Sequence, residues 1–368
     1  MIRRLEQYLK RRVFSFLRFL ISSAQPTDLA TRSFRSIIVI RQHNQLGDML
    51  CVVPLLRGLR ERYPEAHIAL LTSPVNHEVM LNSPYVDRLI NYDKREFLGG
   101  VSIKFVAFVK FVRKLRAEKF ELAVVPSTVS VSATSDLLAY LSGAKYRIGA
   151  GEIDGEGNPS GVFFNCPVTL DWRESEHRHQ ALRNLDNAQV LHLNVADLSS
   201  QIELTEEESR GARAFVIDLR LQVGSFVVYH VGAGKPANRW PAERFAQLAN
   251  RLSSDSKAGT LFTHGPMDDE PVRIVKSTLT VPYSVVDGKS IRQVAAILSL
   301  ARLVVSNDTG IMHVAAAVGT PVLSLFGPTD PEQWAPIGAK HRYIVGKGGD
   351  IQSIQVEEVL TAAREMLR

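Results

Sequence analysis

Four residues that could bind a ligand stand between an apolar run and a helix-forming run near the C-terminus. The stretch VVSNDTGIMHVAAA contains, in order, Asp308, Thr309, Gly310 and His313. If residues 302–306 form a strand and residues 312–319 a helix, the first N–H groups of that helix point outward with the positive end of its dipole. Asp308 as a plain helix cap would explain one residue only. A phosphorylated polyol would use all four, because carboxylate and hydroxyl suit sugar hydroxyls and the N–H groups suit a phosphate.

A glycine-bearing loop follows another apolar run. Residues 225–231, SFVVYHV, are typical of a buried strand, and GAGKPANRW comes next. Lys235 and Arg239 suit a diphosphate, because two cations and backbone N–H groups can converge on it. The loop also fits a dinucleotide fingerprint at Gly232, Gly234 and Ala237. Pro236 argues against that fingerprint, since it has no N–H to donate.

A third candidate is an acid near the N-terminus. Gly47 and Asp48 follow the apolar run SIIVI through the loop RQHNQL and stand at the start of an expected helix. Asp48 could cap that helix. It could instead project toward a ligand and remove a proton as a general base. From these residues alone both interpretations stay open.

The elements that must position these residues alternate between strand and helix, which indicates an α/β chain with doubly wound parallel sheets. We expect strands at residues 36–40, 68–72, 122–126, 225–231, 259–265, 283–288, 302–306 and 322–327. We expect helices at residues 49–64, 101–120, 241–252, 312–319 and 354–367. Ligands of such sheets bind outside the carboxyl ends of the strands. We therefore expect two Rossmann-like domains, over residues 35–195 and 196–345, that face each other across a cleft.

Composition narrows the class of protein. The chain has 368 residues, a net charge of +6 and a pI near 9.3, which favours an anionic partner. Its two cysteines, Cys51 and Cys166, lack the spacing of a metal site, exclude a disulfide scaffold and favour a cytoplasmic location. No basic-aromatic cluster supports a nucleic-acid partner.

The two ends of the chain are expected to be separate helices. Residues 1–34 form a basic N-terminal segment, in which residues 1–24 combine helical apolar spacing with arginines and lysines. Such a helix can lie on an anionic membrane surface or pack on its own domain. Arg18 interrupts the apolar region, which argues against a signal peptide. Residues 346–368 complete the chain with an amphipathic helix.

Taken together, four motifs resemble those of glycosyltransferase family 9, the lipopolysaccharide heptosyltransferases. They are GDMLCVVPLLRGLRERYP from Gly47, SGAKYRIG from Ser142, GAGKPANRWP from Gly232 and SNDTGIMHVAAAVGTPVLSLFGPTDPEQWAPIG from Ser306. The resemblance extends from about Ser36 to the C-terminus. It implies a GT-B fold, an ADP-activated heptose donor, a lipopolysaccharide core acceptor and inversion at the anomeric carbon. It implies no essential metal ion, and we expect no other cofactor. A lipid-linked acceptor at the inner leaflet would suit the basic N-terminal helix, so we expect a cytoplasmic protein that lies on the cytoplasmic face of the inner membrane.

The resemblance also implies roles for individual residues. Asp48 matches a general base, and Lys235 matches a lysine that binds the donor's diphosphate, with Arg239 near it. The residues that match the motif for the donor's sugar and diphosphate are Asp308, Thr309, Gly310 and His313. Either Asp268 or Glu270 matches an acid that binds the adenosine ribose. Asn44, Gln45 and Gly47 belong to the loop that faces the acceptor. Many members carry a basic residue in this loop, where this chain has the sequence QHNQ at residues 42–45.

Two other functions remain open from the sequence. A nicotinamide-dependent oxidoreductase would use the fingerprint glycines of residues 232–237. A non-catalytic protein that binds nucleotide sugars would use the same loops without a base. The order and spacing of the four motifs favour the transferase over both.

Overall fold

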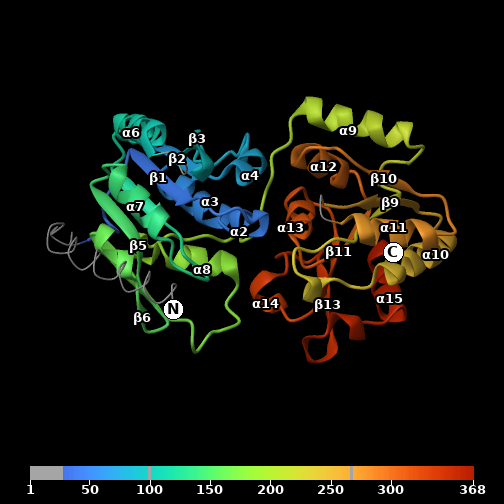
Figure 1. Cartoon of the computed structure of the whole chain (residues 1–368). Helices are drawn as coiled ribbons and strands as arrows, with labels where there is room; N and C mark the ends of the chain where they lie inside the picture. Colours follow the sequence, from blue (N-terminus) through green and yellow to red (C-terminus); the bar gives the residue numbers. More distant parts are fainter. Residues whose placement is uncertain (1–27, 98–100, 266–267) are drawn as a thin grey trace. The chain divides into compact units, whose positions relative to one another are not determined.

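The computed structural model describes residues 28–97, 101–265 and 268–368, which divide into two compact units, each built on one sheet (Figure 1). The first unit runs to Leu198 except for two short segments, Gln45–Leu50 and Glu78–Asn82. These two segments belong to the second unit together with Ser199–Arg368. The expected amphipathic helix over residues 1–24 lies outside the described residues.

The first unit holds a mainly parallel sheet with strand order β3-β2-β1-β4-β5-β6, in which β7 also pairs with β5. Its strands are β1 (Ser36–Arg41), β2 (His67–Thr72), β3 (Arg88–Asn91), β4 (Leu122–Val125), β5 (Tyr146–Ile153), β6 (Glu156–Gly157) and β7 (Cys166–Leu170). The central strands β1, β2 and β4 are continuous apolar runs because both faces of a doubly wound sheet are covered by helices. Among the described strands of this sheet, only β5 and β6 pair antiparallel.

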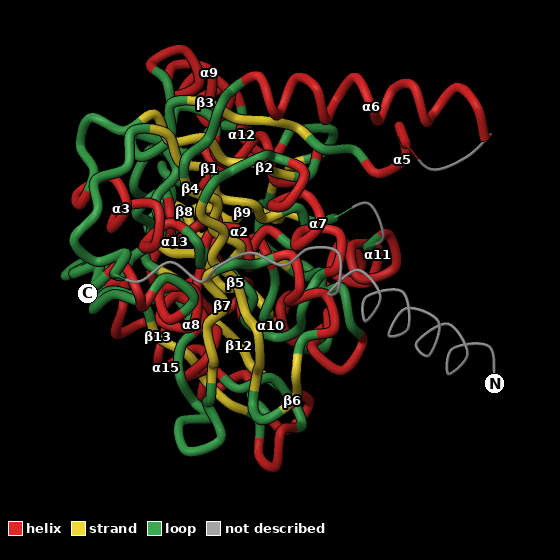
Figure 2. The backbone as a smooth tube through the Cα atoms, turned by 90° about the vertical axis from the view of Figure 1, so that its left-hand side faces the viewer, coloured by secondary structure: helices red, strands yellow, loops and turns green. Residues whose placement is uncertain are grey.

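Helices cover both faces of this sheet, as right-handed crossovers require. They are α3 (Val53–Arg62), α4 (Pro74–His77), α5 (Lys94–Phe97), α6 (Val101–Ala117), α7 (Ala133–Leu141) and α8 (Gln180–Asp186). Leu115 of α6 and Leu138 of α7 join one apolar cluster with Ile38 and Ile40 of β1, whereas α3 packs against α8. In Figure 2 the N-terminal end of α6 extends beyond α7.

The second unit holds a fully parallel sheet with strand order β10-β9-β8-β11-β12-β13. Its strands are β8 (Phe226–His230), β9 (Gly259–Thr263), β10 (Ser284–Val286), β11 (Leu303–Asn307), β12 (Val322–Phe326) and β13 (Arg342–Val345). Its helices are α2 (Leu46–Leu50), α9 (Glu206–Asp218), α10 (Ala242–Ser256), α11 (Asp269–Thr278), α12 (Ile291–Leu298), α13 (Gly310–Ala317), α14 (Pro331–Trp334) and α15 (Val356–Leu367). The C-terminal α15 shares the apolar core of α10 and α11, so it is part of this unit.

The structure confirms the expected α/β class with two doubly wound parallel sheets, and it differs from the expected elements in several places. The helix expected over residues 49–64 is two helices, α2 and α3, with Pro54 in the first turn of α3, where its missing N–H costs nothing. Residues 45–50, expected in the first domain, group with the second unit. Strands β3, β5, β6, β7 and β13 were not expected from the sequence. Strands β3 and β13 are short and largely exposed, so they lack the apolar run of a central strand. In β5, glycines and charged residues interrupt the apolar run.

Candidate functional site

The candidate site of the second unit lies where its strand order reverses. Strands β8 and β11 are neighbours, and the chain continues outward from β8 in one direction and from β11 in the other. Loops leaving such a switch point diverge to opposite faces of the sheet and leave room for a ligand. The two loops are residues 231–239 after β8 and residues 308–309 after β11. Every donor-site residue expected from the sequence except Asp268 and Glu270 lies on these loops or on α13.

Asn307, the last residue of β11, ties the two loops together. Its side chain is fully buried, accepts from the N–H of Trp240 at 3.0 Å and donates to the carbonyl oxygens of Val231 and Gly232, each at 3.1 Å. Three buried hydrogen bonds from one amide fix where the glycine loop begins and ends. The sequence analysis missed Asn307, although it stands inside the SNDTG motif directly before Asp308.

Asp308 is held by a polar group that the sequence did not reveal. Asn238 donates to its carboxylate at 2.9 Å and to the hydroxyl of Thr329 at 3.1 Å. Burial raises the pKa of Asp308, whereas the Thr329 hydroxyl and the Lys235 ammonium act in the opposite direction. Asp308 does not cap α13, because the cap position belongs to Thr309. The capping interpretation of Asp308 is therefore wrong, and its carboxylate joins the loop after β8.

The glycine loop carries one exposed cation and one that is engaged within the loop. Lys235 is exposed at the tip. Arg239 donates to the carbonyl oxygen of Ala233 at 2.9 Å and forms an ion pair with Asp268 at 3.5 Å. Arg239 thus shapes the loop, and Lys235 is the side chain that extends toward solvent.

Asp268 is buried within the unit. Its carboxylate accepts from the N–H of Gly265 at 2.7 Å and lies where a Cβ on Gly232 would stand, 1.9 Å from that position. Gly232 is therefore explained by close packing against Asp268, without a dinucleotide. Glu270, the other acid proposed for a ribose, is exposed in the first turn of α11, as is its neighbour Asp269.

Two glycines bring α2 against α13. A Cβ on Gly47 would stand 2.6 Å from Cδ2 of His313, and a Cβ on Gly310 would stand 3.0 Å from Cβ of Leu46. Each helix thus offers a glycine where the other places a side chain, and the ring of the buried His313 rests on the α2 backbone. Asp48, one residue after Gly47, is half-buried on α2. The crossing places the candidate base in the same unit as the donor loops.

The expected acceptor loop spans the division between units. Asn44 is the last residue of a segment that belongs to the first unit, and Gln45 is the first residue of the short segment that belongs to the second. Both side chains are exposed. Gln42, before them, is buried and donates to the hydroxyls of Ser132 and Ser135 at 3.1 and 3.4 Å. Both serines belong to the segment that follows β4, so Gln42 joins the two loops that flank the strand reversal of the first sheet.

Asp136 on α7 is a fully buried acid of the first unit. It accepts from the Ser160 hydroxyl at 2.6 Å and from Asn158 at 3.0 Å through the same oxygen. Burial raises the pKa of Asp136 to about 6, and the two hydrogen bonds offset only part of that rise.

This raised pKa predicts a stability that falls as pH rises. The folded state holds the proton more tightly than the unfolded state, so the contribution is complete below pH 3.8 and is lost as pH passes through about 6. The total loss is about 3 kcal/mol. We expect Asp136→Asn, which keeps a hydrogen-bond acceptor without a charge, to stabilise the protein by about that amount at pH 7 and to leave it unchanged at pH 4. Urea unfolding of both proteins across this range measures the difference. The exposed-site variant Asp218→Asn serves as control, and an equal effect of Asp136→Asn at both pH values would contradict the prediction.

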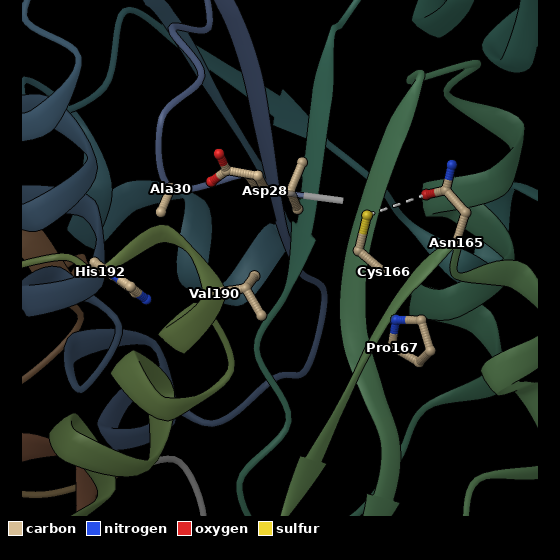
Figure 3. A pocket seen from close by; sticks show the side chains of 8 residues that line it. Asp28, Ala30, Asn165, Cys166, Pro167, Val190 and His192 are labelled. Atoms are coloured by element: carbon tan, nitrogen blue, oxygen red, sulfur yellow. Dashed lines mark hydrogen bonds between the residues drawn. The ribbon is translucent and has the colours of Figure 1, made fainter. Parts of the chain in front are cut away.

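A cavity of about 340 Å³ in the first unit is lined by none of the expected site residues (Figure 3). Cys166, Asn165 and His192 are among the residues that line it. Burial raises the pKa of the Cys166 thiol to about 11, so the sulfur stays protonated and is a poor nucleophile. None of the residues proposed for the transfer lines this cavity.

Comparisons with known proteins agree with the motifs. The sequence model of glycosyltransferase family 9 (heptosyltransferase) matches residues 108–360. Lipopolysaccharide heptosyltransferase 2 of Escherichia coli (strain K12) is 26% identical over 313 residues, which cover 81% of this chain and 85% of that protein. A glycosyl transferase family 9 crystal structure from Veillonella parvula DSM 2008 is 26% identical with a TM-score of 0.79, over 94% of this chain and 99% of that one.

A further likeness concerns the fold alone. The structure of E. coli heptosyltransferase WaaC with ADP-2-deoxy-2-fluoro heptose is 19% identical with a TM-score of 0.69, over 90% of this chain and 99% of that one. These structural likenesses confirm the expected GT-B class of fold, built from two Rossmann-like units. In the part of the chain that the structure describes, no helix has both the length and the apolar character needed to cross a bilayer.

Proposed function

Because this chain belongs to glycosyltransferase family 9, we propose that it moves a heptose from an ADP-activated donor to a lipopolysaccharide core acceptor, with inversion at the anomeric carbon. The chain is a glycosyltransferase, and the identities of donor and acceptor are the proposal. The E. coli relative is named for lipopolysaccharide, and WaaC was solved with an ADP-heptose analogue. The close contact of α2 with α13, in which Gly47, the neighbour of Asp48, lies against His313, is the observation that supports the proposed mechanism.

The donor would bind at the switch point of the second unit. Lys235 would meet the diphosphate, together with the N–H groups that begin α13 at Gly310. Asp308, fixed by Asn238 and Thr329, would accept hydrogen bonds from hydroxyls of the sugar. Of the two acids proposed for the ribose, Glu270 is the better candidate because Asp268 is buried against Gly232.

The transfer itself needs a proton acceptor and a stabilised leaving group. An acceptor hydroxyl attacks the anomeric carbon while the bond from that carbon to the diphosphate oxygen breaks, through an oxocarbenium-like state. Asp48 would take the proton of the attacking hydroxyl, because a neutral alcohol is a weak nucleophile. Negative charge on the departing ADP would be met by Lys235 and the helix N–H groups, already oriented before reaction. This scheme requires no metal ion or other cofactor.

Incubation with a panel of nucleotide sugars and truncated lipopolysaccharide acceptors, followed by mass spectrometry, tests the proposal. We expect the acceptor to gain the mass of one heptose with ADP-heptose and of no other sugar with the remaining donors. Transfer from a different nucleotide sugar would refute the proposed donor, and transfer to a non-lipopolysaccharide acceptor the proposed acceptor.

Removing the exposed cation of the glycine loop should weaken nucleotide binding. We expect Lys235→Ala to raise the dissociation constant of ADP about 10- to 100-fold, since a charge-assisted hydrogen bond to phosphate contributes about 1.5–3 kcal/mol. Calorimetric titration with ADP measures this directly. Lys276→Ala, which removes an exposed lysine from the last turn of α11, is the matched control. If both variants bind ADP like the original protein, Lys235 does not contact the diphosphate.

A further inference from the structure

Helix α6 of the first unit is anchored by aromatic side chains on one side only. Tyr92 stacks on Phe97 with ring centroids 5.2 Å apart, and both contact Phe111 at 5.4 and 5.5 Å. Phe108 meets Phe97 edge-on at 5.6 Å. This cluster, with Leu115 beneath it, buries the inner face of α6 against its own unit.

The outer face of α6 carries apolar side chains that this cluster does not cover. Phe105 is 68% exposed and Val106 is 53% exposed, next to each other near the N-terminal end of the helix. Other strongly exposed apolar residues, such as Val129 and Ile217, have no apolar neighbour of this kind beside them in sequence. A phenylalanine and a valine left in water together cost free energy that a partner surface could recover.

Cations follow these apolar residues along the same helix. From residue 101 to residue 117 the charged residues are all basic, namely Lys104, Lys110, Arg113, Lys114 and Arg116. At 100° per residue, Arg113 lies within about 20° of Val106 around the helix, so both point to the same side. Seven residues separate them, which is about 10 Å along the axis. In Figure 2 this N-terminal end of α6 is the part of the helix that extends beyond α7.

We infer that the outer face of α6 docks on an anionic phospholipid surface, with Phe105 and Val106 entering the acyl boundary. Apolar faces of interfacial helices enter about 5–10 Å into that boundary, which leaves Lys110 and Arg113 at the level of the lipid phosphates. Each such cation contributes about 1 kcal/mol of attraction, a roughly fivefold gain in binding. A protein partner would need acidic side chains matched to these positions, whereas an anionic bilayer supplies negative charge everywhere. The inference is separate from any role of residues 1–24 and from the proposed donor and acceptor.

Sedimentation of the full chain with vesicles tests this inference. Vesicles of phosphatidylglycerol and phosphatidylethanolamine serve as the anionic surface, and phosphatidylcholine vesicles as the neutral one. We expect Phe105→Ser/Val106→Ser and Lys110→Glu/Arg113→Glu each to lower partition onto anionic vesicles at least about tenfold. Binding that survives both pairs of substitutions would overturn the inference and leave residues 1–24 as the remaining candidate. Absence of binding by the original protein would also overturn it.

Helix α9 provides matched controls. Arg210→Glu/Arg213→Glu repeats the same charge change at the same spacing on an exposed face, and Ile217→Ser removes an equally exposed apolar side chain. Both should bind vesicles like the original protein. A loss equal to that of the α6 variants would show a nonspecific effect of charge or hydropathy and would overturn the assignment to α6.

A tryptophan at residue 105 reports position independently of affinity. The emission of Phe105→Trp should shift to shorter wavelength on anionic vesicles and be quenched by brominated lipid, and that of Ile217→Trp should not. An unquenched Phe105→Trp on vesicles that bind the protein would contradict insertion at this helix.

Discussion

Replacement of Asp48 by asparagine should lower the turnover of heptose transfer about 10²- to 10⁴-fold, the range that a positioned general base supplies. Asparagine keeps the size and the polarity of the side chain, so the contact of α2 with α13 should survive. The affinity for ADP should therefore stay within about twofold of the original. Steady-state transfer kinetics and calorimetry with ADP, on the same preparation, separate the two quantities.

The comparison with a second acid makes this result specific. Asp218→Asn, on the exposed face of α9, changes the net charge equally and should leave turnover unchanged. A near-original rate for Asp48→Asn would show that Asp48 supports α2 and takes no proton. A loss of rate together with a loss of ADP binding would indicate a displaced helix.

The class of fold followed from the sequence because buried parallel strands leave a strong signal. Apolar runs such as residues 36–40 and 302–306 end in polar loops, and this alternation predicted the central strands of both sheets but not β5 and β7. Residues 45–50 could not be assigned in the same way. Five residues of α2 carry no periodicity of their own, and only contact with α13 groups them with the second unit.

The sequence indicated candidate site residues by their chemical type, but it could not assign each of them a role. The sequence could not choose between Asp268 and Glu270, because their difference lies in burial: Asp268 fills the space beside Gly232, and Glu270 reaches solvent. Asn238 and Thr329 were missed because neither residue type is distinctive, and their hydrogen bonds depend on tertiary contacts. Gly310 was interpreted as a phosphate contact, and the structure adds a packing reason for it.

The close packing of α2 against α13 predicts a second large loss of turnover, on substitution of Gly47. Gly47→Ala places a methyl group 2.6 Å from the ring of His313, closer than carbon atoms approach. The buried ring cannot rotate away freely, so α2 must shift along α13 and carry Asp48 with it. We expect turnover to fall about 10²-fold, since a displacement near 1 Å of a catalytic group costs that much. Overpacking should also lower stability by about 1–3 kcal/mol.

A series of glycine-to-alanine variants distinguishes a displaced base from general destabilisation. At Gly310 the new methyl group would stand 3.0 Å from Cβ of Leu46, a milder overlap than the 2.6 Å at Gly47, so Gly310→Ala should reduce turnover less than Gly47→Ala. At Gly211, on α9, no atom lies within 4 Å of the added carbon, and the rate should not change. Transfer assays well below the unfolding temperature of each variant give the order. If Gly47→Ala loses no more activity than Gly211→Ala, close contact between α2 and α13 does not position Asp48, and the base must be sought among other residues.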